Sequence, residues 1–173
     1  MCPDAHPHPR PTVSRRHFGL IAGAFALVPF ASARASGDVD ALALTCIDYR
    51  LVGSGVQLLD SLGLTKDFDQ VALAGASLAA TSDKFPSANA AFWDQLDIAR
   101  QLHHVRRLVV VDHRDCGAYK VVFGKDFASN APAEDAQHLA VMQKVKAELA
   151  QKHPELTSEY YLMALDGTAK KLL

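Results

Sequence analysis

The sequence predicts one α/β domain with a mainly parallel β-sheet flanked by helices. Short apolar segments alternate with segments of helical periodicity, which is typical of βαβ units. The composition is globular, since 49% of the 173 residues are hydrophobic and 21% are charged. Three cysteines are too few for a disulfide scaffold, so a packed core must stabilise the chain. These observations exclude a disordered or collagen-like protein.

The first 35 residues differ from the rest and predict a twin-arginine-type signal peptide. Arg15 and Arg16 precede an uncharged apolar run at 19–33, which is shorter than the ~20 residues that a membrane span needs. Small residues follow, and they predict cleavage after Ala33 or Ala35. The alternative is an uncleaved membrane anchor.

Cleavage would leave a domain at 36–173 that is periplasmic or secreted. That domain keeps 14 basic and 18 acidic residues, a net charge of −4, without a basic patch. Nucleic acid is therefore not an expected partner, and no stable membrane association is expected after cleavage.

Apolar runs predict the strands of this domain, and helical spacing predicts its helices. The β-branched run at 108–111 is the clearest strand, while Phe92, Leu96 and Ala99 recur at helical spacing. A polar, proline-containing loop is expected at 81–87. In order, we expect a strand at 39–45, a helix at 56–62, a strand at 71–74, helix 88–103, strand 108–111, helix 132–152 and strand 160–165.

Two cysteines and a histidine follow predicted central strands. Cys46 lies just past the first strand, and His113 and Cys116 lie just past the strand at 108–111. Ligands of open parallel sheets bind at this edge, and two thiolates with one imidazole suit a tetrahedral Zn²⁺ with an open fourth position. Two alternatives remain: a disulfide between the cysteines after export, or inert buried thiols beside a turn histidine.

These residues form two motifs that resemble those of the β-class carbonic anhydrases. Cys46-x-Asp48-x-Arg50 matches the family's C-x-D-x-R motif, and His113-x-x-Cys116-Gly117 matches its H-x-x-C-G motif. The resemblance implies a β-carbonic-anhydrase-like fold, with Cys46, His113 and Cys116 as zinc ligands and Asp48 with Arg50 as the neighbouring catalytic pair. It further implies reversible hydration of carbon dioxide to bicarbonate by a zinc-bound hydroxide, in a homo-oligomer that is a dimer or higher.

The sequence also departs from the family. Where the family usually carries an Arg-Asn-Ala-Gly-Asn-like segment, this chain has Ala-Leu-Ala-Gly-Ala-Ser at 72–77, and Asp112 replaces the usual glycine before the ligand histidine. We expect Asp112 to orient His113 or to cap its strand. The departures leave two alternatives: a zinc-binding module without hydratase activity, and a hydrolase of a related small molecule such as carbon disulfide.

The other histidines have simpler interpretations. His103 and His104 end a predicted helix, where positive charge suits the helix dipole, although one of them could shuttle protons. By their pattern, His138 and His153 are expected on solvated helix surfaces.

Overall fold

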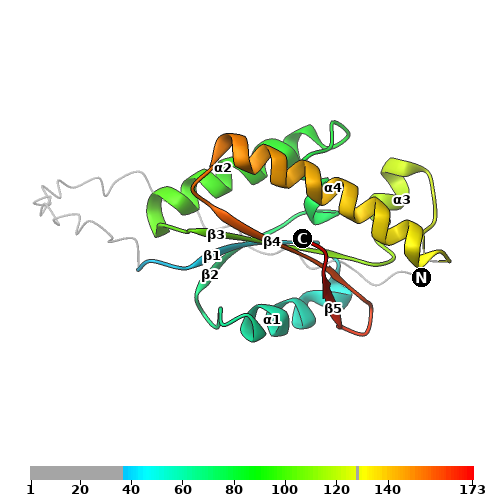
Figure 1. Ribbon diagram of the computed structural model, residues 1–173, viewed down its shortest axis with the longest axis horizontal. Helices are drawn as coiled ribbons and strands as arrows, with labels where there is room; N and C mark the ends of the chain where they lie inside the picture. The colour runs from blue at the N-terminus through cyan, green and yellow to red at the C-terminus, as the bar shows by residue number, and fades with distance from the viewer. Residues whose placement is uncertain (1–36, 128) are drawn as a thin grey trace, which may run out of the picture. The chain divides into compact units, whose positions relative to one another are not determined.

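The computed structural model describes residues 37–127 and 129–173, which form a sheet between helices (Figure 1). The sheet has five strands in the order β2-β1-β3-β4-β5, and all its pairs are parallel except β4 with β5. The strands are β1 (Ala41–Thr45), β2 (Phe68–Ala72), β3 (Arg107–His113), β4 (Thr157–Met163) and β5 (Ala169–Lys171). The predicted fold class is confirmed.

Helices cover both faces of the sheet. Figure 1 shows α1 on one face and α2 and α4 on the other. The helices are α1 (Val52–Ser61), α2 (Pro86–His103), α3 (Gly117–Phe123) and α4 (Ala131–Lys152), with short 3₁₀ turns η1 (Tyr49–Leu51) and η2 (Ala76–Leu78). Among the described residues, no helix combines the length and apolar character needed to cross a bilayer.

The alternation of side chains along β1 explains this arrangement. Leu42 and Leu44 belong to a core cluster that includes residues of α2 and α4, whereas Ala41 and Ala43 belong to a second cluster with Leu59 of α1. A strand covered on both faces is apolar at successive positions, which is why this segment reads as an unbroken apolar run. The core therefore lies on both sides of β1 and β3.

Two element boundaries differ from the prediction. β2 covers Phe68–Ala72 rather than 71–74, because an edge strand with one unpaired side tolerates the polar Asp69 and Gln70. α1 begins at Val52 rather than at residue 56, because Asp48 caps η1 and the chain continues directly into the helix. Apolar runs and glycine positions in the sequence do not mark the start of β2 or the start of α1.

The remaining elements show which bounds the local sequence pattern predicts and which it does not. α2 and α4 lie where they were expected, and Pro86 occupies the start of α2, where its missing N–H costs nothing. β4 begins earlier, at Thr157, and α3 and β5 were not predicted because each is short. The expected signal segment at 1–35, with Ala33 and Ala35, lies outside the described residues.

Two histidines that were expected in solvent are buried. His138 is 1% exposed and His153 is 6% exposed. His153 stacks on the indole ring of Trp93, and burial lowers the pKa of its imidazole. His103, at the end of α2, instead contacts Asp69 of β2, with 2.7 Å between Nδ1 and Oδ2.

Candidate metal centre

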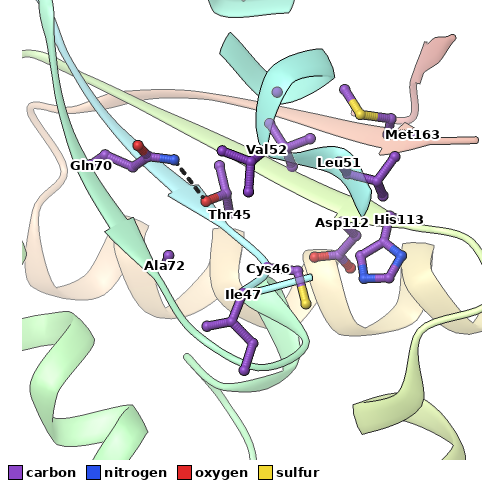
Figure 2. Close-up of a pocket in the computed structure, with 12 residues that line it drawn as sticks. Thr45, Cys46, Ile47, Leu51, Val52, Gln70, Ala72, Asp112, His113 and Met163 are labelled. Atoms are coloured by element: carbon purple, nitrogen blue, oxygen red, sulfur yellow. Dashed lines mark hydrogen bonds between the residues drawn. The ribbon is translucent and has the colours of Figure 1, made fainter. Parts of the chain in front are cut away.

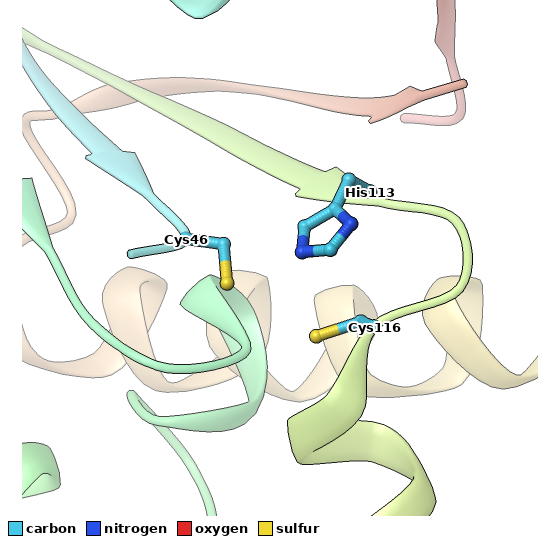
Figure 3. A group of neighbouring side chains, drawn as sticks. All are labelled: Cys46, His113 and Cys116. Carbon is cyan, nitrogen blue, oxygen red and sulfur yellow. The ribbon is translucent and has the colours of Figure 1, made fainter. Parts of the chain in front are cut away.

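The three predicted ligand residues meet at the carboxyl ends of β1 and β3. Cys46 follows β1, His113 is the last residue of β3, and Cys116 is the N-cap of α3. Figure 3 shows both sulfur atoms directed toward the space beside the imidazole ring. One ligand atom from each residue lies within 4.8 Å of the other two. The structure thus brings together side chains that are about seventy positions apart in the sequence.

His113 presents Nε2 to this space. Its Nδ1 lies 2.8 Å from the carbonyl oxygen of Arg114, so Nδ1 carries the proton and donates it to that oxygen. Nε2 is buried and has no hydrogen-bond partner among the residues that the structure describes. A buried polar atom without a partner is costly, and a metal ion bound to Nε2 would remove that cost. The donor set of two sulfurs and one nitrogen fits zinc.

Cys46 and Cys116 form no disulfide, and each changes the pKa of the other. The Cys116 thiol donates to Cys46 and so lowers the pKa of Cys46, and the resulting Cys46 thiolate raises the pKa of Cys116. The backbone N–H of Gly75 also donates to Cys46 Sγ at 3.3 Å. Burial opposes a proton on His113, but contact with the Cys46 thiolate raises the pKa of this imidazole overall. The negative charge therefore lies on the Cys46 sulfur, and the Cys116 thiol and the imidazole stabilise it.

Asp48 and Arg50 form a tightly coupled pair beside these ligands. Arg50 Nε lies 3.0 Å from Asp48 Oδ1, and one terminal nitrogen lies 2.7 Å from Oδ2. These hydrogen bonds lower the pKa of Asp48 to about 2, so its carboxylate stays ionised at ordinary pH. Asp48 Oδ2 is 3.7 Å from His113 Nε2, the atom left without a partner. The predicted pair therefore adjoins the predicted ligands.

A second carboxylate holds Arg50 from the other side. Asp115 lies between the two ligands of the second motif and accepts from Arg50 through Oδ2 at 3.1 Å and through its carbonyl oxygen at 3.3 Å. Its backbone is left-handed, with φ of 55°. Buried Glu134 of α4 fixes this conformation by accepting the Asp115 N–H at 2.7 Å. Sequence reasoning did not predict that Asp115 binds Arg50 or that Glu134 holds Asp115, because Asp115 occupies a variable position of its motif and no motif marks Glu134.

A cavity of about 340 Å³ adjoins the ligands (Figure 2). Apolar side chains form much of its wall, and Gln70 donates to Thr45 on one side with 3.0 Å between the side-chain atoms. The lining residues are Thr45, Cys46, Ile47, Leu51, Val52, Gly55, Gln70, Ala72, Val111, Asp112, His113 and Met163. A small neutral molecule could therefore approach Cys46 and His113 through an apolar space.

Asp112 does not hold His113 through a direct hydrogen bond, and it lies within β3 instead of capping it, so the expectations of a direct orienting contact and of a strand cap are both wrong. His113 Nδ1 donates to the Arg114 carbonyl instead. Asp112, the residue before His113 in β3, is 1% exposed. Its carboxylate accepts from Ser77 and Tyr119 and lies within hydrogen-bond distance of His138 Nδ1.

Gly75 allows the turn after β2 to approach α3. Its φ is +82°, and a Cβ there would lie 3.0 Å from the Cβ of Ala118. We expect Gly75→Ala to lower the free energy of unfolding by more than the ~1–2 kcal/mol of left-handed strain alone, and to weaken zinc binding by displacing the N–H from Cys46. Chemical denaturation and a zinc competition titration would measure the two effects.

Gly63→Ala is the matched control for this variant. Gly63 has nearly the same conformation, with φ of +80°, but a Cβ there would meet nothing within 4 Å. Gly63→Ala should lower the free energy of unfolding only by the strain of the left-handed backbone, and it should leave zinc affinity unchanged. Equal behaviour of the two variants would contradict the role given to the close approach at Gly75.

Comparison with known proteins places this site in a family. The family model described as "Putative carbonic anhydrase" matches residues 37–157. An uncharacterized protein of Rickettsia conorii is 35% identical over 135 residues, which cover 78% of this chain and 73% of the relative. An uncharacterized protein of Rickettsia bellii is 33% identical over 135 residues, which cover 78% and 82%.

The fold is similar to that of a solved carbonic anhydrase from Streptococcus mutans. The TM-score is 0.52, and the match covers 83% of this chain and 87% of the other at 18% identity. The sheet with flanking helices is thus a carbonic anhydrase fold, and the matched residues 37–157 include both ligand motifs. The chain belongs to the putative carbonic anhydrase family.

Proposed function

We propose that this protein is a zinc lyase that reversibly hydrates carbon dioxide to bicarbonate. The observation that carries the proposal is the convergence of Cys46, His113 and Cys116 beside the Asp48–Arg50 pair. A structural metal site has four protein ligands and no need of a restrained carboxylate, whereas three ligands leave one position open for chemistry.

Cys46 Sγ, Cys116 Sγ and His113 Nε2 would hold the ion. When bound, zinc lowers the pKa of a water molecule toward ~7 and so supplies a nucleophile at neutral pH. That magnitude is the general one for carbonic anhydrase and is not specific to this site. The Nδ1–H of His113, held by the Arg114 carbonyl, keeps Nε2 available as the donor atom.

Arg50 would keep Asp48 ionised and directed away from the open position. Two of its nitrogens bind the Asp48 carboxylate while a third binds Asp115, so the guanidinium is anchored at both ends. Arginine keeps its proton under all working conditions, so this restraint does not vary with pH. Asp48 can then accept a hydrogen bond at the open position without filling it.

The cavity supports a small neutral substrate. Ile47, Leu51, Val52 and Met163 line it close to Cys46 and His113, and such a wall suits uncharged carbon dioxide better than an ionised molecule. A free edge of β2, with exposed Ile47, Tyr49 and Val52 nearby, also supports the proposed homo-oligomer. Export through the twin-arginine route to a periplasmic or secreted location stays a proposal from residues 1–35.

Stopped-flow measurement of carbon dioxide hydration tests this function. Zinc-loaded protein should hydrate carbon dioxide above the buffer rate, and Asp48→Asn should lower that rate while zinc content stays at the wild-type level. Since the pKa of Asp48 is about 2, its ionisation cannot produce a pH dependence near neutrality, so a rate that rises with pH there must come from another group.

A zinc-replete wild type without hydration above buffer at any pH would overturn the lyase proposal. Two alternatives would then remain, a zinc-binding module and a hydrolase of a related molecule. The apolar segment at 72–77 favours the binding module, because it lacks the polar neighbours usual in the family. Measuring carbon disulfide hydrolysis on the same sample would separate the two.

A further inference from the structure

The carboxylate of Asp112 lies at the centre of a buried hydrogen-bond network. The Ser77 N–H donates to Oδ1 at 2.9 Å, and the Ser77 hydroxyl donates to Oδ2 at 2.6 Å. The Tyr119 hydroxyl also donates to Oδ2 at 2.7 Å, and His138 Nδ1 lies 2.8 Å from the same oxygen. None of the four residues is more than 1% exposed. Four donors thus compensate a carboxylate that has lost its water.

The groups around Asp112 Oδ2 can all donate to it. The hydroxyls of Ser77 and Tyr119 and the Nδ1 of His138 lie within 2.8 Å of this oxygen, and the two hydroxyls lie 2.9 Å from each other. The rings of Tyr119 and His138 are in contact, with centroids 3.9 Å apart. Burial and the nearby Asp112 charge raise the pKa of Tyr119, so its hydroxyl keeps its proton. The two hydroxyls, the imidazole and the Asp112 side chain therefore form one connected network.

Asp112, Tyr119 and Ser77 are each connected to a candidate metal ligand through a short stretch of chain, in the case of Ser77 with one hydrogen bond. Asp112 directly precedes His113, and Tyr119 is on the first turn of α3, which begins after Cys116. Ser77 follows Gly75 by two residues, and the Gly75 N–H donates to Cys46 Sγ. The network therefore joins the three chain segments that determine where the three ligand atoms lie.

Helix α4 contacts the segment from Asp112 to Cys116 at two places. His138 holds Asp112 before the first ligand of the loop, and Glu134, one turn earlier on the same helix, holds the N–H of Asp115 just before the second. Glu134 also pairs with Arg114, with 2.9 Å between the charged atoms. The segment from Asp112 to Cys116 is thus fixed at both ends by one rigid element.

We propose that Asp112 is a positioning residue of the metal centre, which sets the placement of Cys46, His113 and Cys116 through Ser77, Tyr119 and His138. The inference rests on the proposed zinc site and extends it to residues that contact neither metal nor substrate. The proposal gives the buried Asp112 side chain a role, because glycine or alanine at this position would remove the acceptor that groups from three elements share.

Two substitutions in the full-length protein test this role. Asp112→Asn keeps the size of the side chain but replaces one acceptor oxygen with an NH₂ group that faces donors, so the network cannot be completed. Zinc affinity should fall by about 10–100-fold, the usual effect of losing a group that orients metal ligands. Tyr119→Phe removes a single donor and should have a smaller effect in the same direction.

Cobalt substitution gives a readout that stability alone does not move. The visible and sulfur-to-metal bands of bound Co²⁺ report the ligand geometry, and both should shift in Asp112→Asn at saturating metal. Leu149→Ala is the control, because Leu149 is buried on the same helix about three turns beyond His138. It should lower the Tm without changing zinc affinity or the cobalt spectrum.

Wild-type zinc affinity and cobalt spectrum in Asp112→Asn would overturn the proposal, and so would equal changes in Leu149→Ala. If Asp112→Asn does not fold, Tyr119→Phe and Ser77→Ala decide on the same two readouts. A wild type that binds metal without hydrating carbon dioxide would contradict the proposed function alone. A wild type that binds neither zinc nor cobalt would contradict both proposals.

Discussion

Cys46→Ser, His113→Ala and Cys116→Ser should each reduce bound zinc from about one ion per chain to nearly none. Each change removes one of three ligand atoms that lie within 4.8 Å of one another, and the two that remain cannot complete a tetrahedral site. In His113→Ala the loss includes Nε2, the buried atom that has no other partner among the described residues. Elemental analysis of protein purified without chelator would measure the zinc content.

The third cysteine of the sequence provides a matched control. In the uncleaved chain, Cys2→Ser removes the same chemical group outside both motifs and should leave one zinc per chain. In wild-type protein, thiol reagents should modify Cys46 and Cys116 only after a chelator removes the metal, because ligated thiolates are masked. A metal-free protein with a Cys46–Cys116 disulfide and full stability would instead favour the structural alternative.

Arg50→Ala should lower carbon dioxide hydration on the order of 100-fold while zinc content is kept. Without the guanidinium, Asp48 loses the contacts at 2.7 Å and 3.0 Å that hold it, and its Oδ2 already lies 3.7 Å from His113 Nε2. The free carboxylate would turn toward the cation and close the open position. This variant should therefore be more damaging than Asp48→Asn, which removes the competing charge itself.

Paired assays of rate and metal content would test this expectation. Arg106→Ala is a suitable control, since Arg106 also pairs with an aspartate but is largely exposed and lies at the amino end of β3. It should keep both activity and zinc. Arg50→Lys should recover little, because an ammonium cannot reproduce the forked contacts with Asp48 and Asp115. Full activity in Arg50→Ala would show that Asp48 needs no restraint.

The convergence of the candidate ligand residues could be predicted because short motifs mark them at strand ends. β1 and β3 read as apolar runs, and in a parallel sheet their carboxyl ends meet at one edge, so Cys46 and His113 had to be neighbours. The supporting residues carry no such mark. His138 looks like a surface residue in the sequence, and its burial is explained by Asp112 of β3 and Tyr119 of α3, which both contact its imidazole.

Helix α4 also shows that a sequence pattern does not identify buried polar residues. Its buried face includes Val141, Met142, Val145 and Leu149, but also Glu134 and His138 at the same helical spacing. A pattern that counts apolar residues assigns these two to solvent, although the partner of His138 lies at the end of β3 and that of Glu134 lies in the loop after it. Polar positions on a buried face become predictable only when the acceptor on the opposite element is known.

The long separation between Cys46 and His113 has a consequence for how the protein acquires metal. The two residues become neighbours only after β1 has paired with β3, which closes a loop that contains β2 and α2. Closing such a loop costs chain entropy before any ligand contact is gained, so an ion cannot nucleate this fold as it does in small zinc domains. Capture of the proposed ion would therefore follow sheet assembly. The bound ion would then stabilise an already native chain by mass action, to an extent that rises with its free concentration where folding is completed.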